Sequence, residues 1–197
     1  MPLLRLSRLV KGFFRRATRI ARVKWFALLS TNDRITGRPK RHQPIFSEGS
    51  GSIIFGSNVA IGVNSSPGFW STYCYLESRN RSASIEIGND TWINNGFSAI
   101  AQKCEIQIGR NCLIGHDVTI VDSDFHSLNP NDRHSGGPIS VGNVIISDNV
   151  FIGSRVTILK NTQIGSGSVV GAGSVVAGRF PENCVIAGNP AVVIRIL

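Results

Sequence analysis

Residues 146–181 read ISDNVF IGSRVT ILKNTQ IGSGSV VGAGSV VAGRFP, and each of these six blocks of six residues begins with Ile or Val. An α-helix repeats its face every 3.6 residues and a β-strand every 2, so a strict period of six fits neither element alone. It fits short strands joined by tight turns, with each strand directing one large aliphatic side chain inward. The stretch therefore predicts a β-solenoid.

Three such sides close one triangular coil of about 18 residues, and successive coils pair in parallel. The spacing predicts three stacked pairs of core residues: Ile146 on Ile164, Ile152 on Val170, and Ile158 on Val176. The fifth residue of a block is small or β-branched at all but one position, as a crowded corner requires: Val150, Val156, Thr162, Ser168 and Ser174, with Phe180 as the exception.

The same spacing recurs less regularly from about residue 53 onward. It is seen at Phe55 and Ile61, breaks near Pro67, and returns at Ile87 and Ile108. We therefore expect one all-β solenoid domain over residues 51–197, with about six coils and a height of roughly 29 Å at about 4.8 Å per coil.

Composition agrees with a single solenoid domain. The chain has 197 residues, 8% aromatic residues and 21 glycines, as expected for a core of Ile and Val with frequent turns. Its four cysteines are far apart and form no CxxC pair: Cys74, Cys104, Cys112 and Cys184. This spacing indicates neither a zinc site nor a disulfide framework, and it favours free thiols in a reducing cytoplasm.

The net charge of +9 is concentrated at the N-terminus. Residues 1–50 hold 12 Lys or Arg against two acids, a net +10, whereas residues 51–197 hold 9 against 10, a net −1. A nucleic-acid groove would require a basic solenoid, so the charge predicts no nucleic-acid partner.

Residues 1–30 carry eight Lys or Arg and no acid, and apolar residues recur among them at helical spacing: Leu6, Leu9, Val10, Phe13, Ala17 and Ile20. We predict a basic amphipathic helix, followed by a linker over residues 31–50. The charges are too frequent for a transmembrane span or a signal peptide. The helix either lies on an anionic cytoplasmic membrane surface, which would make the protein peripheral there, or packs against the first coil or a neighbouring subunit.

The longest break in the pattern predicts a functional loop over about residues 121–143. Ile120 and Ile146 are 26 residues apart, which is not a multiple of six. A long loop that leaves a regular scaffold is usually functional or disordered. Asp122, Asp124 and His126 alternate, so in an extended chain their side chains leave on the same side. Imidazole is a base near neutral pH, and a nearby carboxylate can orient it.

Three features together resemble the hexapeptide-repeat acyltransferase family: the sixfold pattern, the histidine in DSDFHSL, and the run NVFIGSRVTILKNTQIGSGSVVGAGSVVAGRFPENCVIAGNPAVVIR. This family includes galactoside, maltose and xenobiotic acetyltransferases and many capsule or lipopolysaccharide O-acetyltransferases. The resemblance covers about residues 53–195. It implies a left-handed parallel β-helix, acetyl-CoA as co-substrate, no metal, and a homotrimer whose active sites lie between adjacent subunits.

The resemblance also implies roles for individual residues. His126 matches the catalytic histidine, with Asp122 or Asp124 as its orienting carboxylate, and Asn95 matches an asparagine that contacts the acceptor or the intermediate. Arg133 and His134, in the same loop, are candidates for acceptor contact. Residues along the acyl-CoA are matched by position: Phe151, Gly153, Ser154, Ala172, Ala177 and, near the nucleotide phosphates, Arg195. Val192 and Gly178 stand where relatives often carry Arg and Lys.

These observations predict a cytoplasmic, acetyl-CoA-dependent O-acetyltransferase that acts on a sugar or glycan precursor. Two alternatives remain open from the sequence. One is an N-acetyltransferase that acts on an amino-sugar nucleotide, and the other is a non-catalytic solenoid that binds membranes or protein partners. His116, in a turn of a regular repeat, is interpreted as an exposed residue without a catalytic role.

Overall fold

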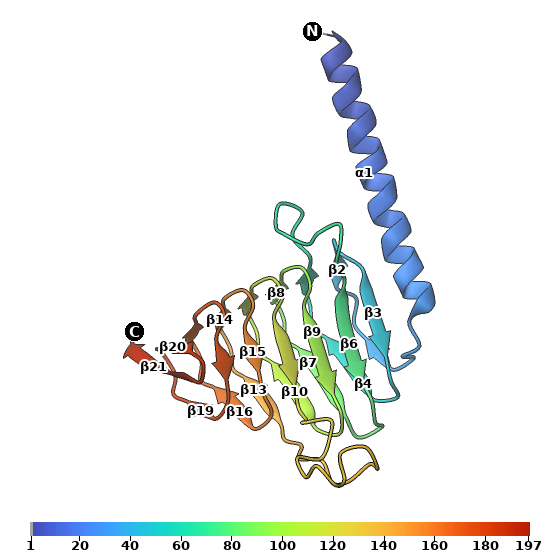
Figure 1. The fold of residues 1–197 in the computed structure, drawn as a ribbon. Coiled ribbons are helices and arrows are strands. Elements are labelled where there is room, and N and C mark those ends of the chain that lie inside the picture. The colour runs from blue at the N-terminus through green and yellow to red at the C-terminus, as the bar shows by residue number, and fades with distance from the viewer. Residues whose placement is uncertain (1) are drawn as a thin grey trace.

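A computed structural model of the protein describes residues 2–197, with the side chains of residues 10–197. The chain forms a parallel β-helix of triangular cross-section, with one long helix at its N-terminal end (Figure 1). Each coil contributes one short strand to each of three sheets, here named A, B and C in the order in which the chain passes through them. Six complete coils are followed by a partial seventh.

The helix and the strands have the following bounds. The helix α1 spans Pro2–Leu29. Sheet A contains β1 (Ile35–Thr36), β4 (Ser52–Phe55), β7 (Ser84–Ile87), β10 (Glu105–Ile108), β13 (Val144–Ile146), β16 (Thr162–Ile164) and β19 (Arg179–Phe180). Sheet B contains β2 (Lys40–Arg41), β5 (Ala60–Ile61), β8 (Trp92–Ile93), β11 (Leu113–Ile114), β14 (Phe151–Ile152), β17 (Val169–Val170), β20 (Cys184–Gly188) and the antiparallel β21 (Ala191–Ile196). Sheet C contains β3 (Ile45–Glu48), β6 (Cys74–Ser78), β9 (Ser98–Ala101), β12 (Thr119–Val121), β15 (Thr157–Ile158) and β18 (Val175–Val176).

The strand register confirms the predicted stacking of the core. The three predicted pairs face each other in parallel: Ile146 and Ile164, Ile152 and Val170, Ile158 and Val176. All six side chains are buried. The predicted corner residues are buried as well: Val150, Val156, Thr162, Ser168 and Ser174. The hexapeptide period therefore fixes which side chains point inward and which coil residues meet.

The first coil begins earlier than the sequence pattern indicated. The strands β1, β2 and β3 lie within residues 35–48, inside the segment predicted to be a linker. Ile35 pairs with Ile53 and Ile45 pairs with Cys74, so this segment is the lowest layer of the β-helix. The boundary of the β-helix is thus near residue 35 rather than residue 51. The pattern missed this layer because its strands are separated by Pro39 and Pro44 and do not follow the spacing of six.

The C-terminal part of α1 packs on the outer face of sheet C. The Phe26 ring lies 4.7 Å from the Tyr73 ring and 6.1 Å from the Phe46 ring, centroid to centroid. The Arg22 guanidinium donates hydrogen bonds to the carbonyl oxygens of Phe69 (2.9 Å) and Thr72 (2.8 Å), and burial lowers its pKa. Towards its N-terminus the helix extends beyond the β-helix (Figure 1).

The turn that follows α1 closes the free edge of β3. The backbone N–H groups of Thr31 and Asn32 donate to the carbonyl oxygen of Ser47, at 2.9 and 3.3 Å. The Ser47 N–H donates to the hydroxyl oxygen of Ser30 at 3.0 Å. Both backbone groups of Ser47 on this edge are therefore paired within the same chain.

The four cysteines are all free thiols, and Cys74, Cys112 and Cys184 are buried. Burial raises the pKa of the Cys74 thiol. Among the described residues, no helix is long and apolar enough to cross a membrane.

Candidate active site

The loop of residues 122–143 leaves the β-helix at the corner between sheets C and A. The strand β12 ends at Val121, and the chain returns to sheet A at Val144, in agreement with the predicted loop boundaries. In Figure 1 the loop projects at the lower edge of the β-helix, away from the coil stack. An antiparallel bridge between Ser123 and Val141 joins its two ends. The loop is thus a closed excursion on a rigid corner.

Asp122 lies at the base of this loop and binds the backbone of a neighbouring turn. Its side chain is buried, and its carboxylate accepts hydrogen bonds from the backbone N–H groups of Gln102 (2.7 Å), Lys103 (3.0 Å) and Cys104 (2.8 Å). These three groups belong to the turn between β9 and β10, one coil earlier in the chain. Both carboxylate oxygens of Asp122 are therefore engaged in holding that turn.

Asp124 connects the loop to the next coil along the chain, through Lys160 between β15 and β16. One of its carboxylate oxygens, Oδ1, lies 2.5 Å from the Lys160 ammonium nitrogen, and both side chains are mostly enclosed. The backbone N–H of Asp124 donates to the carbonyl oxygen of Ser140 at 3.1 Å. The other carboxylate oxygen, Oδ2, is buried and has no hydrogen-bond partner among the described side chains and backbone. Asp124 thus retains an acceptor that Asp122 lacks.

His126 follows directly on a strained turn. Phe125 has a φ of +59°, in the left-handed region that bulky side chains rarely adopt, and the His126 N–H donates to the Asp124 carbonyl oxygen at 2.7 Å. The Ser123 hydroxyl accepts the Phe125 N–H at 2.8 Å, and the Arg79 guanidinium lies 4.8 Å from the centre of the Phe125 ring. These contacts fix the backbone, while the His126 side chain is exposed.

Arg133 and His134 lie further along the same loop, and both are exposed. The Arg133 guanidinium donates to the carbonyl oxygens of Ser127 and Leu128, at 3.5 and 3.2 Å. Arg133 therefore braces the segment that directly follows His126. The structure brings both residues into the loop of His126, as the sequence indicated.

A second group of candidate residues lines the outer face of sheet B. Strand register stacks the outward side chains of Trp92, Leu113 and Phe151 in one row, and these are 58%, 52% and 48% exposed. They form the apolar wall of a cavity of about 310 Å³, whose rim includes Asn94 and Ser154. Large apolar side chains exposed in one row indicate a contact or ligand surface.

The candidate acyl-CoA residues divide between two corners of the β-helix. Gly153, Ser154 and Ala172 lie at the corner between sheets B and C, next to Phe151, whereas Ala177 follows β18 at the corner between C and A. Arg195 lies in β21, opposite Val185 in sheet B, and is exposed. A Cβ on Gly153 would come within 2.6 Å of the Ala172 backbone nitrogen. The close stacking of the coils thus requires glycine at position 153.

These corners are separated by the whole width of sheet C. In one coil, His116 at the corner between B and C and Asp122 at the corner between C and A are six residues apart, or about 20 Å along an extended strand. Within one chain, His126 and Ala177 therefore share one corner, and Ser154 and Ala172 share another.

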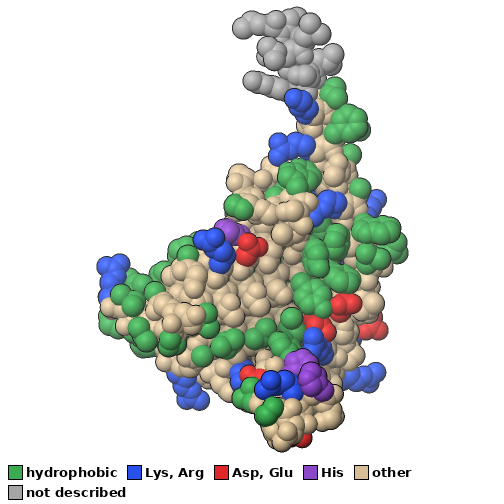
Figure 2. All heavy atoms as spheres, viewed as in Figure 1, with side chains coloured by type: hydrophobic (Ala, Val, Ile, Leu, Met, Phe, Trp, Pro, Cys, Tyr) green, Lys and Arg blue, Asp and Glu red, His purple; other side chains and the backbone are tan. Residues whose placement is uncertain are grey.

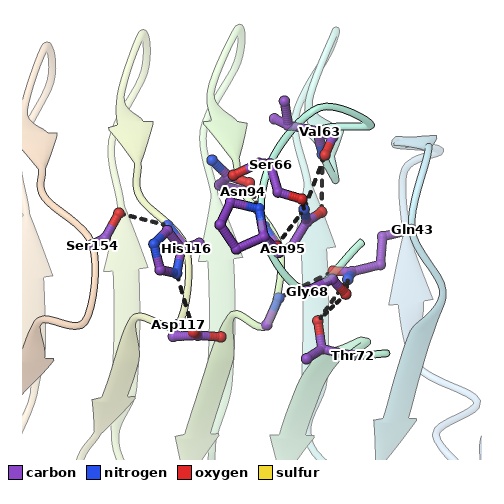
Figure 3. A network of polar contacts seen from close by, with 12 residues as sticks. Gln43, Val63, Ser66, Gly68, Thr72, Asn94, Asn95, His116, Asp117 and Ser154 are labelled. Atoms are coloured by element: carbon purple, nitrogen blue, oxygen red, sulfur yellow. Dashed lines mark hydrogen bonds and ion pairs between the residues drawn. The ribbon is translucent and has the colours of Figure 1, made fainter. Parts of the chain in front are cut away.

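Asn95 is occupied by backbone contacts and does not face an open site (Figure 3). Its side chain is fully buried. Its amide oxygen accepts the Val63 N–H at 3.0 Å, and its amide nitrogen donates to the carbonyl oxygens of Val63, Ser66 and Pro67, at 2.9, 3.2 and 2.9 Å. Asn95 therefore anchors the loop between β5 and β6, at the corner between sheets B and C, whereas His126 lies at the corner between sheets C and A. A direct contact with an acceptor does not fit this environment.

His116 is better enclosed than the sequence interpretation assumed. Its side chain is 20% exposed, and its Nδ1 atom lies 3.0 Å from the Asp117 carboxylate. Its backbone N–H donates to the Ser154 hydroxyl at 3.3 Å, beside the sheet B cavity (Figure 3). In the sequence, the adjacent His and Asp in GHDV were the only feature that pointed to this contact between His116 and Asp117.

Among the described residues there is no group of three or more His, Cys, Asp and Glu side chains that could hold a metal ion.

Comparisons with known proteins agree with this architecture. Residues 143–178 match the family model described as bacterial transferase hexapeptide (six repeats). The polysialic acid O-acetyltransferase of Escherichia coli O1:K1 / APEC is 40% identical over 116 residues, which are 58% of this chain and 37% of that protein. The chain therefore spans well under half the length of this curated relative.

Solved structures have the same fold. The polySia-specific acetyltransferase NeuO is 28% identical, with a TM-score of 0.54, over 85% of this chain and 74% of that chain. A maltose O-acetyltransferase from Clostridium difficile 630 is 25% identical, with a TM-score of 0.52, over 96% of this chain and 88% of that chain. A Vibrio cholerae hexapeptide-repeat acetyltransferase complexed with acetyl-CoA is 23% identical, with a TM-score of 0.55, over 94% and 84%. These neighbours support the left-handed sense expected for the β-helix. Residues 143–178 thus match the repeats of this family model, and the fold of the chain is similar to that of these acetyltransferases.

Proposed function

We propose that the protein transfers an acetyl group from acetyl-CoA to a hydroxyl group of a sugar or glycan precursor. The observation that carries this proposal is the His126 imidazole, which is exposed at the end of a turn whose backbone is fixed by hydrogen bonds. The relative at 40% identity is named as a polysialic acid O-acetyltransferase, which supports a sugar hydroxyl as acceptor.

The outer face of sheet B suits the acyl-CoA arm. Trp92, Leu113 and Phe151 offer an apolar wall for the methylene groups of pantetheine, while the Ser154 hydroxyl and nearby backbone groups offer hydrogen bonds to its amides. Gly153 supports this surface through coil stacking, and Ala172 is exposed at its end. If the acyl-CoA continues along sheet B towards β21, Arg195 would contact its nucleotide phosphates.

The base and the acyl-CoA surface lie on different corners, so we propose that each active site forms between two chains of a homotrimer. The corner that carries His126 and Ala177 in one subunit would face Phe151, Ser154 and Ala172 in the next. This arrangement is the simplest way for one reaction centre to use both groups, because sheet C separates them within a chain.

In the proposed reaction, an imidazole nitrogen of His126 accepts the proton of the acceptor hydroxyl as its oxygen attacks the thioester carbonyl carbon. The carbon–sulfur bond then breaks, and the departing thiolate takes up a proton. A sugar hydroxyl is far too weak an acid to be ionised beforehand by imidazole, so proton removal accompanies attack. General-base assistance of this kind contributes typically about 10² to 10⁴ in rate.

Asp124 is the better candidate for orienting the imidazole. Its Oδ2 atom is buried without a partner, whereas the carboxylate of Asp122 accepts three backbone N–H groups. A hydrogen bond from the imidazole to Asp124 would fix the tautomer and stabilise the protonated ring. Because acetyl-CoA is made and used in the cytoplasm, we propose a cytoplasmic location for this reaction, and the free thiols agree with a reducing compartment.

The test is release of free thiol from acetyl-CoA with polysialic acid, neutral oligosaccharides and amino-sugar nucleotides as acceptors. With a saturating acceptor, His126→Ala should lower turnover by at least about 10²-fold and leave acetyl-CoA binding little changed. Asn131→Ala, at an exposed site of the same loop, is the matched control and should retain most activity. Near-full activity of His126→Ala would exclude His126 as the base. Acetylation of only an amino group would instead favour N-acetyl transfer.

A further inference from the structure

The face of α1 that meets the β-helix is defined by three contacts. Phe26 packs on Phe46 and Tyr73, the Arg22 guanidinium donates to two backbone carbonyls, and the Arg15 guanidinium lies 5.5 Å from the centre of the Trp70 ring. Residues 15, 22 and 26 recur at the spacing of one helical face. The helix therefore has a fixed rotation about its axis, set by contacts in its C-terminal half.

Along residues 10–28, the opposite face of α1 is exposed and mostly apolar, and Lys24 is the one basic residue within it. At 100° per residue, Val10, Phe14 and Leu28 lie within about 40° of one another and roughly opposite Phe26, with Phe13 and Trp25 at the margins. Their exposed fractions are 46%, 63%, 78%, 70% and 58% in that order. This stripe is about 27 Å long at about 1.5 Å per residue. Figure 2 shows hydrophobic side chains along the side of the helix that points away from the β-helix.

The charge of the helix distinguishes between two occupants of this stripe. Residues 1–32 contain eight Lys or Arg and no acid. Lys11 and Arg16 are exposed and lie on the two sides of the stripe. A second copy of the helix would bring like charges together with no carboxylate on the helix to pair with them. An anionic surface would neutralise them, and an apolar stripe flanked by basic residues is the pattern of helices that lie in a membrane interface.

We infer that α1 is an interfacial helix whose apolar stripe, Val10 to Leu28, inserts into an anionic lipid surface. Because Arg22 and Phe26 fix the helix to sheet C, the β-helix is held at one orientation on the opposite side of α1 from the lipid. The inference does not depend on the acetyltransferase proposal, since it rests on the helix alone.

The experiment uses the full-length protein and flotation with two kinds of vesicle, phosphatidylcholine alone and phosphatidylcholine with about 30% phosphatidylglycerol. The wild type should bind the anionic vesicles, more weakly as salt is raised, and should bind the neutral vesicles poorly. Phe13→Gln with Phe14→Gln should weaken binding at least about tenfold, and Lys11→Glu with Arg16→Glu should remove the preference for anionic lipid. Ile196→Gln, at a 66% exposed site in β21, and Arg81→Glu, on an exposed turn of the β-helix, are the matched controls and should bind like the wild type.

Light scattering and turnover on a soluble acceptor are measured on the same variants. Unchanged mass and turnover with lost vesicle binding would support the lipid surface. Equal binding of wild type and helix variants, or equal binding to neutral and anionic vesicles, would overturn the inference. A lower oligomeric mass of Phe13→Gln with Phe14→Gln, together with a wild type that does not bind vesicles, would instead assign the stripe to a second copy of the chain.

Discussion

If each active site forms between two subunits, two inactive variants should restore activity when they are mixed in one trimer. The first variant is His126→Ala, which removes the proposed base at the corner between sheets C and A. The second is Ala172→Trp, which blocks the proposed acyl-CoA surface at the corner between B and C. Ala172 is exposed, so the larger side chain should not disturb the core.

The size of the effect follows from the geometry. A working site needs an intact C–A corner from one subunit and an intact B–C corner from the next. In a ring of three that contains both variants, whether in a 2:1 or a 1:2 ratio, one of the three junctions has this combination. Mixed trimers should therefore have about one third of wild-type activity, whereas the two parent homotrimers have almost none.

The assay is co-expression of the two variants with different affinity tags, purification on both tags in turn, and thiol release from acetyl-CoA at a saturating acceptor concentration. The control is a doubly substituted chain mixed with wild type. It should give about one third of wild-type activity when two wild-type subunits are present and none when one is present. Inactive mixed trimers would refute the two-chain site and would require both groups to meet within one chain.

Two further predictions test the core and the corner. Ile158→Ala should lower the free energy of unfolding by about 2 to 5 kcal/mol, because Ile158 is fully buried against Val176, and Ile158→Val should cost about 0.5 to 1.5 kcal/mol. Thermal or denaturant unfolding measures both, and an unchanged melting temperature of the alanine variant would contradict the register. Asn95→Ala should destabilise by about 2 kcal/mol, since it removes the hydrogen bonds that the buried Asn95 amide makes with the backbone of Val63 and Pro67, while turnover per folded molecule stays near wild type. Lost turnover with unchanged stability would return Asn95 to a catalytic role.

The sequence was sufficient for the regular part of the fold. A period of six constrains both the direction of each side chain and the neighbour above it, so Ile146, Ile152 and Ile158 could be paired with their partners in advance. The first coil escaped notice because its strands do not follow the spacing of six, and Arg41 and Ser47 stand where the next coil has Ile61 and Leu76. Their pairing depends on the layer above, and a short stretch cannot show this by itself.

The candidate site was harder to predict because its contacts join distant segments. The two carboxylates before His126 look equivalent in the sequence. Asp122 accepts N–H groups from a turn about 20 residues earlier, and Asp124 meets Lys160 from the next coil. Asn95 is surrounded by a loop that begins more than 20 residues before it. These environments differ because stacked coils bring distant segments together, and a local sequence pattern does not show which segments meet.

The hydrogen bonds that close the edge of β3 also bear on aggregation. A stack of parallel strands ends in backbone groups that could accept a strand from another molecule, and regular β-solenoids are therefore prone to end-to-end growth. Here Ser30, Thr31 and Asn32 already occupy both backbone groups of Ser47 at that end of sheet C. The same short turn that connects the helix to the β-helix thus opposes fibre formation. Thr31→Pro, which removes a backbone N–H, or Ser30→Ala, which removes the hydroxyl acceptor, would leave catalysis untouched and still shorten the time for which concentrated protein stays in solution.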